Sequence, residues 1–237
     1  MSNSDTPITC ADIPVGKTVT VKVPASSANL GPGYDTLGVA LGFYDELRVE
    51  CISEGLEFEL SGEGSEAVPR DETHLVIQAM HAAFERGGLH EFPALRLTAH
   101  NRIPHSRGMG SSASAIVAGV AAASGLLPEH AQLSRDQILQ VASDLEGHPD
   151  NVAPSVYGSL SISWGELGDW RSLVVPVHSA VVPIVAVPDY EVSTKLARSL
   201  IPAEIPHEQA AANSGRAALL IQALSQAPEY LMDATVD

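Results

Sequence analysis

Alternation of apolar and polar residues predicts several short β-strands along the chain. Apolar side chains recur at every second position in residues 17–23, 45–51, 57–60, 95–99 and 159–164, which is the period of a half-buried strand. Pro24 is expected to end the first strand, and the next two strands are expected to continue it as an antiparallel meander. Two further strand-like stretches, at residues 173–177 and 181–187, are expected to open a second lobe.

A helical period predicts α-helices between and after these strands. Residues 74–86 place apolar side chains on one face, with Thr73 as the expected N-cap and a glycine pair as the stop. An alanine-rich helix is expected to begin near residue 111, and another to span residues 135–145 with Ser134 as N-cap. Two more are expected at residues 193–200 and 208–224. Because strands and helices interleave without regular βαβ spacing, the predicted fold class is α+β.

Charge and cysteine content narrow the function classes. The 237 residues include 13 Lys and Arg against 29 Asp and Glu, a net charge of −16, which argues against a nucleic-acid partner or an anionic membrane partner. Any phosphate must therefore be bound by local features. Cys10 and Cys51 form no CxxC motif or Cys/His cluster, which excludes a zinc ribbon and a disulfide scaffold and fits a reducing cytoplasm. No stretch is long and apolar enough to predict a membrane span.

The strongest chemical signal is PHSRGMGSSAS at residues 104–114, where a glycine-punctuated loop leads into a helix. A helix N-terminus presents unpaired N–H groups and the positive end of the helix dipole, and Gly108 and Gly110 would let an anion approach the backbone. The segment lacks the lysine of a Walker A loop and is not GxGxxG. It predicts a phosphate site, with a plain glycine-rich turn capped by Ser111 as the alternative.

Two further segments concentrate polar side chains. EGHPDN at residues 146–151 holds two carboxylates, an imidazole and an amide, and Glu146 or Asp150 could supply the one or two protein oxygens that nucleotide-bound magnesium needs. His148 has no HxxxH partner for zinc. Asn29 and Asp35 flank a Gly-Pro-Gly turn, and without further context they could be turn residues only.

Taken together, PASSANLGPGYDTLG, PHSRGMGSSAS and EGHPDNVAPSVYG resemble the motifs of the GHMP small-molecule kinases in order and spacing. The first segment, in which SSANLGPG precedes an aromatic residue and an aspartate, resembles the homoserine kinase branch, and STKLAR at residues 193–198 agrees with it. The resemblance implies a two-lobed fold: a flexible arm at 1–16, an ATP-binding domain with a mixed sheet at 17–168, and an incomplete C-terminal α/β sandwich domain at 169–237.

The same resemblance implies a reaction, its cofactors and its partners. The chain is expected to use ATP and Mg²⁺ to phosphorylate the side-chain hydroxyl of L-homoserine, giving O-phospho-L-homoserine for threonine biosynthesis in the cytoplasm. It implies no nucleic-acid or membrane partner and leaves room for a homodimer. Catalysis is expected to come mainly from positioning and charge neutralisation. Some GHMP kinases use an aspartate as base, and Asp150 is the candidate here, but the homoserine kinase branch is not thought to depend on one, so that role stays open.

The resemblance also implies roles for individual residues. Main-chain amides of one loop would wrap the ATP phosphates; its residues are Pro104, His105, Ser106, Arg107, Gly108, Met109, Gly110, Ser111, Ser112, Ala113 and Ser114. The expected catalytic residues are Ser112, Glu146 and Asn151, the first two as magnesium ligands. Asn29 and Asp35 would hold the hydroxyl end of homoserine, His148 and Asn151 its amino group, and Thr194 and Arg198 its carboxylate. An arginine can pair a carboxylate through two parallel hydrogen bonds.

One departure from the family pattern is expected to matter. The family carries a third glycine-rich motif resembling SGxGPT and a second substrate arginine, and this sequence contains neither. The chain is therefore expected to be a family member cut inside its C-terminal lobe. Two other functions stay open: a GHMP kinase that acts on a different small alcohol, and a nucleotide-binding module that does not turn over.

Overall fold

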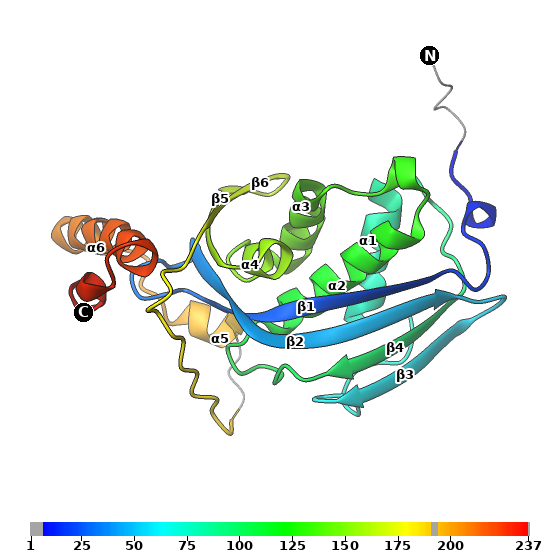
Figure 1. Cartoon of the computed structure of the whole chain (residues 1–237), viewed down its shortest axis with the longest axis horizontal. Helices are drawn as coiled ribbons and strands as arrows, with labels where there is room; N and C mark the ends of the chain where they lie inside the picture. Colours follow the sequence, from blue (N-terminus) through cyan, green and yellow to red (C-terminus); the bar gives the residue numbers. More distant parts are fainter. Residues whose placement is uncertain (1–6, 191–193, 237) are drawn as a thin grey trace, which may run out of the picture.

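The computed structural model describes residues 7–190 and 194–236, which form a sheet layer and a helix layer (Figure 1). The described strands are β1 (Thr18–Ala28), β2 (Leu37–Cys51), β3 (Leu56–Gly62), β4 (Leu95–Asn101), β5 (Leu160–Glu166) and β6 (Asp169–Val175). They form a six-stranded mixed sheet in the order β3-β4-β2-β5-β6, with β1 paired to β2. The α+β prediction is confirmed.

The strand pairing corrects the predicted meander. β1 and β2 are antiparallel, as expected, but β3 pairs with β4, and in parallel. The residues between β3 and β4 include helix α1, a connection long enough to return the chain to the same end of the sheet. Short alternating runs show which residues are half-buried but not which strand lies beside them, so the meander could not be tested on the sequence alone.

Pro24 does not end β1. The strand runs on to Ala28, and the pairing with β2 shifts register between Pro24, opposite Tyr44, and Ser26, opposite Ala40. Because β2 is the one described strand that pairs with β1, a residue without an N–H group is tolerated at such an irregularity. The strand therefore extends into the first polar motif and carries Ser26 and Ser27 into the interior of the fold.

Helices cover one face of the sheet and a second group lies beyond its end. The first group is α1 (Leu75–Arg86), α2 (Ser111–Leu126), α3 (Arg135–Glu146) and α4 (Val152–Tyr157). As predicted, Ser134 caps α3, accepting a hydrogen bond from the backbone N–H of Gln137. The predicted cap of α1 is wrong: the ring of His74 accepts from the N–H of Val76, whereas the hydroxyl of Thr73 donates to Asp71.

The C-terminal segment adds helices but no described strand. It contains α5 (Thr194–Ser199), α6 (His207–Ser225) and α7 (Leu231–Ala234). In Figure 1, α5 lies beside the sheet, and α6 lies at the opposite end of the molecule from the start of β1. Residues 173–175 belong to β6, which pairs with β5 in the main sheet, and residues 181–187 form no strand. A strand at residues 173–175 is therefore confirmed, but it belongs to the main sheet and does not open a second lobe. The strand predicted at 181–187 is wrong, because within the described residues this stretch has no pairing partner. The domain ranges given above stay a prediction.

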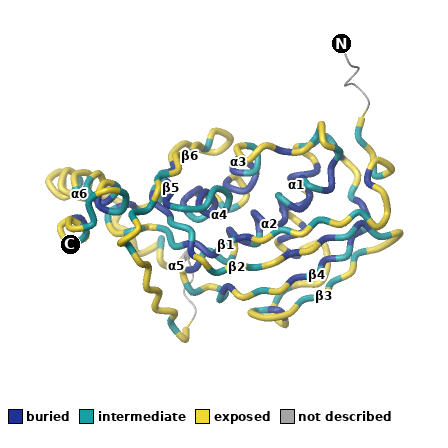
Figure 2. The backbone as a smooth tube through the Cα atoms, in the orientation of Figure 1, coloured by how far each residue is buried: buried dark blue, intermediate teal, exposed yellow. Residues whose placement is uncertain are grey.

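The core lies between the sheet and the first helix group (Figure 2). Helix α2 is buried along most of its length, and its small side chains allow close packing against α1 and β1. Gly119 marks the tightest point, since a Cβ atom there would lie 2.6 Å from the carbonyl oxygen of Val76 and 2.9 Å from the Cβ of Ala79. No helix among the described residues is long and apolar enough to cross a membrane.

A pair of helical glycines tests this packing. We expect Gly119→Ala to destabilise the fold by about 1 to 3 kcal/mol, because the added methyl forces α1 and α2 apart. Gly215→Ala is the matched control: it also lies within a helix, but nothing is within 4 Å of its Cβ position. It should stabilise the fold by about 0.5 to 1 kcal/mol. Urea unfolding of both variants measures the difference, and equal effects would contradict the close α1–α2 contact.

Candidate active site

One cavity brings the three polar motifs together. Its volume is about 970 Å³, and it is lined by the glycine-rich loop, by the turn after β1, by the residues around the end of α3 and by α5. The predicted site residues on its wall are Asn29, Ser106, Arg107, Gly108, Met109, Gly110, Ser111, Ser112, Glu146, His148, Asn151 and Arg198. These residues come from four segments far apart in the sequence, so the fold assembles the site.

The glycine-rich loop lies where β2 has no β4 or β5 partner. β4 pairs with Glu46 to Cys51 and β5 with Leu37 to Val39. Between these two pairings, the Asp45 carboxylate accepts hydrogen bonds from the N–H groups of Arg102 and Ile103, at 2.6 and 2.9 Å. Further along the loop, the carbonyl oxygen of Met109 accepts from the N–H of Ser26 at 3.1 Å. The sheet thus holds both ends of the loop.

Apolar contacts fix the same loop from below. Ile103 and Met109 are buried with Ala25 and Leu41, in a small cluster separate from the main core. Because both loop residues are buried against the sheet, the loop cannot shift without exposing them. Met109 is therefore an anchor as well as part of the cavity wall, a role that the predicted contact with phosphate did not include.

Gly110 is the N-cap of α2 and has a positive φ of 66°. Close packing also requires glycine at this position, because a Cβ atom would lie 2.2 Å from Ser26 Oγ and 2.8 Å from Asn151 Oδ1. Gly108, also at positive φ, faces open space. Gly110 is thus needed for the contact between the loop and two other segments, in addition to the anion approach expected from the sequence.

Ser112 and Glu146 lie side by side at the N-terminus of α2. The Ser112 hydroxyl donates to the Glu146 carboxylate at 2.6 Å. A hydroxyl and a carboxylate oxygen at a helix N-terminus are hard ligands that fit magnesium. Among the described residues no group of three or more His, Cys, Asp and Glu could hold a metal. A cation here would therefore share its coordination with a bound ligand or with water.

Arg198 and Asp35 form an ion pair on the other side of the cavity. The guanidinium donates to both carboxylate oxygens, at 2.6 and 3.0 Å, and to the Tyr34 hydroxyl at 2.9 Å. It also lies 5.5 Å from the Tyr34 ring centre. Tyr34 was not among the predicted site residues, although the sequence pattern includes it. Thr194 begins α5, but its side chain lies outside the described part of the structure.

The turn that carries Asn29 and Asp35 is held in a conformation that L-residues seldom adopt. Both residues have positive φ, 56° and 54°. The N–H of Asp35 donates to Asn29 Oδ1 at 2.9 Å, which closes the turn. Positive φ in non-glycine residues costs energy and concentrates at functional sites. Asn and Asp also adopt this conformation in ordinary turns, so the turn is compatible with both interpretations, and the roles of Asn29 and Asp35 stay a prediction.

His148 and Asn151 line a third part of the cavity, and Asp150 lies behind them. Asp150 is fully buried, and one of its carboxylate oxygens lies 2.6 Å from His148 Nδ1 and accepts from the N–H of Asn151 at 2.9 Å. The hydrogen bond that the His148 ring donates to the Asp150 carboxylate raises the pKa of His148, and partial burial opposes this shift. The charge of Glu146 also raises the pKa, and the charge of Arg198 lowers it. Asp150 is absent from the cavity wall, so its position supports His148 and Asn151 rather than direct contact with a ligand.

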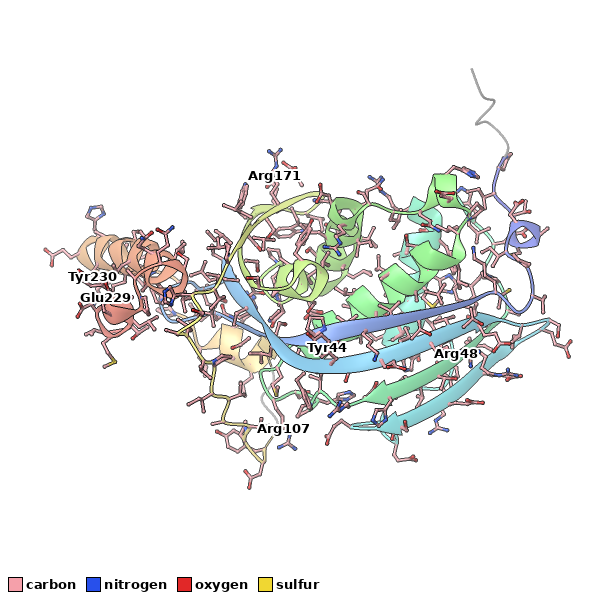
Figure 3. The ribbon with its side chains drawn as sticks, viewed as in Figure 1. Tyr44, Arg48, Arg107, Arg171, Glu229 and Tyr230 are labelled. Atoms are coloured by element: carbon pink, nitrogen blue, oxygen red, sulfur yellow. The ribbon has the colours of Figure 1, made fainter. Side chains whose placement is uncertain are left out.

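Pro104, Ala113 and Ser114 do not line this cavity, and Arg107 lines it but makes its side-chain hydrogen bond elsewhere. The Ala113 and Ser114 side chains are fully buried. Pro104 lies on the half-buried start of the loop, away from the cavity wall. The Arg107 side chain donates to the carbonyl oxygen of Pro188, so it contacts the segment before α5 (Figure 3). Arg107 therefore joins the loop to the C-terminal segment.

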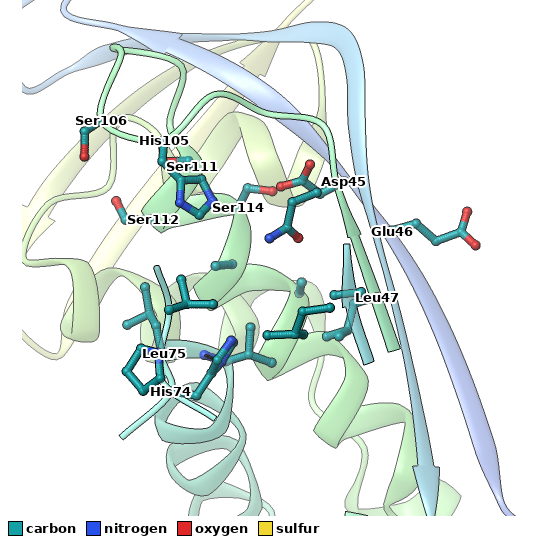
Figure 4. Close-up of a pocket in the computed structure, with 18 of the residues that line it drawn as sticks. Asp45, Glu46, Leu47, His74, Leu75, His105, Ser106, Ser111, Ser112 and Ser114 are labelled. Carbon is teal, nitrogen blue, oxygen red and sulfur yellow. Dashed lines mark hydrogen bonds between the residues drawn. The ribbon is translucent and has the colours of Figure 1, made fainter. Parts of the chain in front are cut away.

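A second cavity of about 310 Å³ opens beside the same loop (Figure 4). Apolar residues of the sheet, α1 and α2 form its walls, and its polar groups come from Asp45, His74, Asn101 and His105. Ser106, Ser111 and Ser112 line both cavities. Sequence reasoning missed this cavity, because the motif at residues 104–114 supplies only part of its wall and the other residues come from several separate elements that carry no motif.

Comparison with known proteins identifies relatives of the whole chain. Residues 74–159 match the model of the GHMP kinases N terminal domain. The chain is 52% identical over 223 residues to a homoserine kinase of Leifsonia xyli subsp. xyli, covering 94% of this chain and 69% of the relative. It is 47% identical over 221 residues to a homoserine kinase of Streptomyces coelicolor, covering 92% and 71%.

Solved structures show the same fold. The crystal structure of homoserine kinase from Cytophaga hutchinsonii matches with a TM-score of 0.77 and 25% identity, covering 93% of this chain and 71% of that one. A phosphomevalonate kinase from Streptococcus pneumoniae matches with a TM-score of 0.63 over 92% of this chain and 76% of that one, at 14% identity, which is evidence for the fold alone. The predicted fold family is confirmed.

The His148–Asp150 pair generates a pH prediction. In an NMR titration we expect the pKa of His148 to lie above the ordinary histidine value and to fall in Asp150→Asn, whereas the pKa of His74 lies below that value because of burial. Because the pKa of His148 is higher in the folded state than in the unfolded state, the His148–Asp150 pair stabilises the fold fully at a pH below the unfolded pKa of about 6.5. This stabilisation is lost as the pH rises through the folded pKa. A His148 pKa that Asp150→Asn leaves unchanged would contradict the pairing.

Proposed function

The chain belongs to the homoserine kinases, a branch of the GHMP kinases, and from this premise we propose that it transfers the terminal phosphoryl group of ATP to the side-chain hydroxyl of L-homoserine. The observation that carries the proposal is one cavity of about 970 Å³ whose wall includes Ser112, Glu146 and Arg198. Asp35 is joined to this wall through its ion pair with Arg198. The product, O-phospho-L-homoserine, would serve threonine biosynthesis in the cytoplasm.

The phosphates of ATP would lie against the glycine-rich loop and the start of α2. The first N–H groups of a helix have no partner within the helix, and α2 begins beside the cavity with a glycine as its N-cap. Ser112 and Glu146 would hold Mg²⁺, which would neutralise charge on the phosphates when bound. In a protein with a net charge of −16, such local positive groups are needed to bind an anion.

The base of ATP would occupy the second cavity. That cavity has apolar walls from α1, α2 and the sheet, polar groups at its rim, and three serines in common with the phosphate side. Small-molecule pockets with this composition place flat apolar groups inside and use a few polar atoms for orientation. We place the base there because Ser106, Ser111 and Ser112 line both cavities. A single ATP molecule could therefore reach from the phosphate site into the second cavity.

Homoserine would bind between the phosphates and α5. A carboxylate on the substrate could take over the two hydrogen bonds that Arg198 now makes to Asp35, and the Asp35 carboxylate would then meet the ammonium group. This arrangement differs from the predicted contact of Asp35 with the hydroxyl end. It follows from chemistry, because the ammonium and carboxylate groups of an amino acid share one carbon and Asp35 lies beside Arg198.

Catalysis in this arrangement rests on positioning. Bringing the hydroxyl and the terminal phosphate together in one cavity supplies the entropic advantage of an intramolecular reaction. Asp150 is enclosed and hydrogen-bonded to His148 and Asn151, so we assign it to support those two residues rather than to accept the hydroxyl proton.

A coupled assay of ADP release over a panel of small alcohols tests the function. L-homoserine should support turnover well above that with mevalonate or L-serine, because the site pairs an ammonium and a carboxylate at a fixed distance from the phosphates. Equal turnover of mevalonate and homoserine would favour a GHMP kinase for another alcohol. ATP binding without turnover of any alcohol would favour a nucleotide-binding module.

Glu146→Gln tests the proposed magnesium ligand. The substitution keeps the size of the side chain but removes its charge, so the Mg²⁺ concentration for half-maximal ADP release should rise by about tenfold or more, as expected for loss of a charged ligand. Glu166→Gln, at the far end of β5, is the matched control. An unchanged magnesium titration in Glu146→Gln would show that Glu146 is not a ligand.

Arg198→Ala tests the substrate side. Loss of a charged hydrogen-bond donor should weaken transition-state binding of homoserine by about 1.5 to 3 kcal/mol, which lowers kcat/KM for homoserine by roughly 10- to 150-fold. The KM for ATP should stay within about twofold. Arg171→Ala removes an exposed arginine paired with Asp169 and should change neither constant. If Arg198→Ala alters ATP affinity instead, Arg198 belongs to the nucleotide side.

A further inference from the structure

Ser26 is a buried residue of the first motif, PASSANLGPGYDTLG, that has no role among those predicted from the sequence. It follows the register shift in β1 and is fully buried. Its Oγ lies 2.9 Å from Asn151 Oδ1 and 3.2 Å from the Asn151 carbonyl oxygen, and its N–H donates to Met109. Ser26 thus contacts both the glycine-rich loop and a residue on the wall of the active-site cavity.

The hydroxyl of Ser26 has one proton to donate, and the neighbouring groups decide where it goes. The Asn151 carbonyl oxygen already accepts from the Ser155 hydroxyl at 2.9 Å and from the Ser155 N–H at 3.4 Å, which occupies both of its lone pairs. Asn151 Oδ1 is also the nearer of the two acceptors. The Ser26 proton is therefore directed to Oδ1.

This hydrogen bond decides which end of the Asn151 amide faces the cavity. An asparagine amide has an oxygen that accepts and a nitrogen that donates two hydrogen bonds. With Oδ1 turned to Ser26, the amide nitrogen is the atom left for a ligand, since no described residue accepts a hydrogen bond from it. Asn29 is oriented in the same way, because the N–H of Asp35 holds its Oδ1.

We propose that Ser26 is a positioning residue that holds the Asn151 amide with its N–H groups toward the reacting oxygens in the cavity. The proposal rests on the proposed function and makes it more specific. Held in this way, Asn151 donates to an oxygen of the substrate hydroxyl or of the terminal phosphate and cannot accept the hydroxyl proton. It also revises the predicted contact with the ammonium group, since two donors do not pair.

A double-substitution experiment separates orientation from packing. In Ser26→Ala the amide can turn over, and kcat for homoserine should fall about tenfold while the dissociation constant of ATP stays within twofold. In an Asn151→Asp background the side chain ends in two equivalent oxygens, so its orientation no longer matters. There, Ser26→Ala should lower the remaining kcat by less than about twofold. Equal losses in both backgrounds would overturn the proposal in favour of packing.

Ser27→Ala is the matched control, because Ser27 is the next residue of β1, is half-buried and makes no side-chain hydrogen bond among the described residues. Its kcat and the dissociation constant of ATP should equal those of the parent protein. A tenfold loss in Ser27→Ala as well would overturn the proposal, since any change in this part of β1 would then have the same effect.

A spectroscopic readout keeps this test independent of turnover. In the ¹⁵N-labelled free protein, the side-chain NH₂ pair of Asn151 is identified by its loss in Asn151→Asp. It should shift in Ser26→Ala and stay in place in Ser27→Ala. An Asn151 pair that does not respond to Ser26→Ala overturns the positioning role. Failure of the parent protein to release ADP with homoserine would instead contradict the proposed function.

Discussion

The arrangement of the site depends on one close contact among three segments: Gly110 at the start of α2, Ser26 in β1 and Asn151 at the start of α4. A single methyl group at position 110 would lie 2.2 Å from Ser26 Oγ and 2.8 Å from Asn151 Oδ1. Closely packed protein interiors have no room for such an atom, so the three segments can meet only where a glycine stands. The contact joins the loop proposed to bind phosphates to a residue proposed to act on the substrate.

The sheet makes this contact possible by leaving part of β2 without β4 or β5. In that interval a side chain and a small cluster replace the strand pairing: the Asp45 carboxylate accepts the N–H groups of Arg102 and Ile103, and Ile103 and Met109 pack against Leu41. Burial raises the pKa of Asp45, while the two N–H groups lower it. The loop is thereby fixed on the sheet, although it has no regular structure itself.

Local signals in the sequence predicted α1, α2, α3, α5 and α6 and most strands, because apolar periods and caps such as Ser134 act within a few residues. The short helices α4 and α7 were not predicted. These local signals failed where a strand boundary or a strand pairing depends on residues far away in the sequence. Pro24 was expected to end β1, but β1 has only one neighbour among the described strands and tolerates it. The parallel pairing of β3 with β4 is not encoded in the alternation of either strand. In the site, the motifs located the loop, Glu146 and Asn151. The contacts of Ser26 and Tyr34 and the second cavity could be identified only from the three-dimensional structure.

The most direct test of this account is the affinity of Gly110→Ala for both ligands, measured by calorimetry with a non-hydrolysable ATP analogue and with L-homoserine. If the contact of Gly110 with Ser26 and Asn151 joins the two halves of the site, both dissociation constants should rise by about tenfold or more, because overpacking of about 1 to 3 kcal/mol displaces both segments. Gly108→Ala, whose Cβ faces open space, should leave homoserine binding unchanged. If Gly110→Ala weakens only the nucleotide, the two halves are independent and the account is wrong.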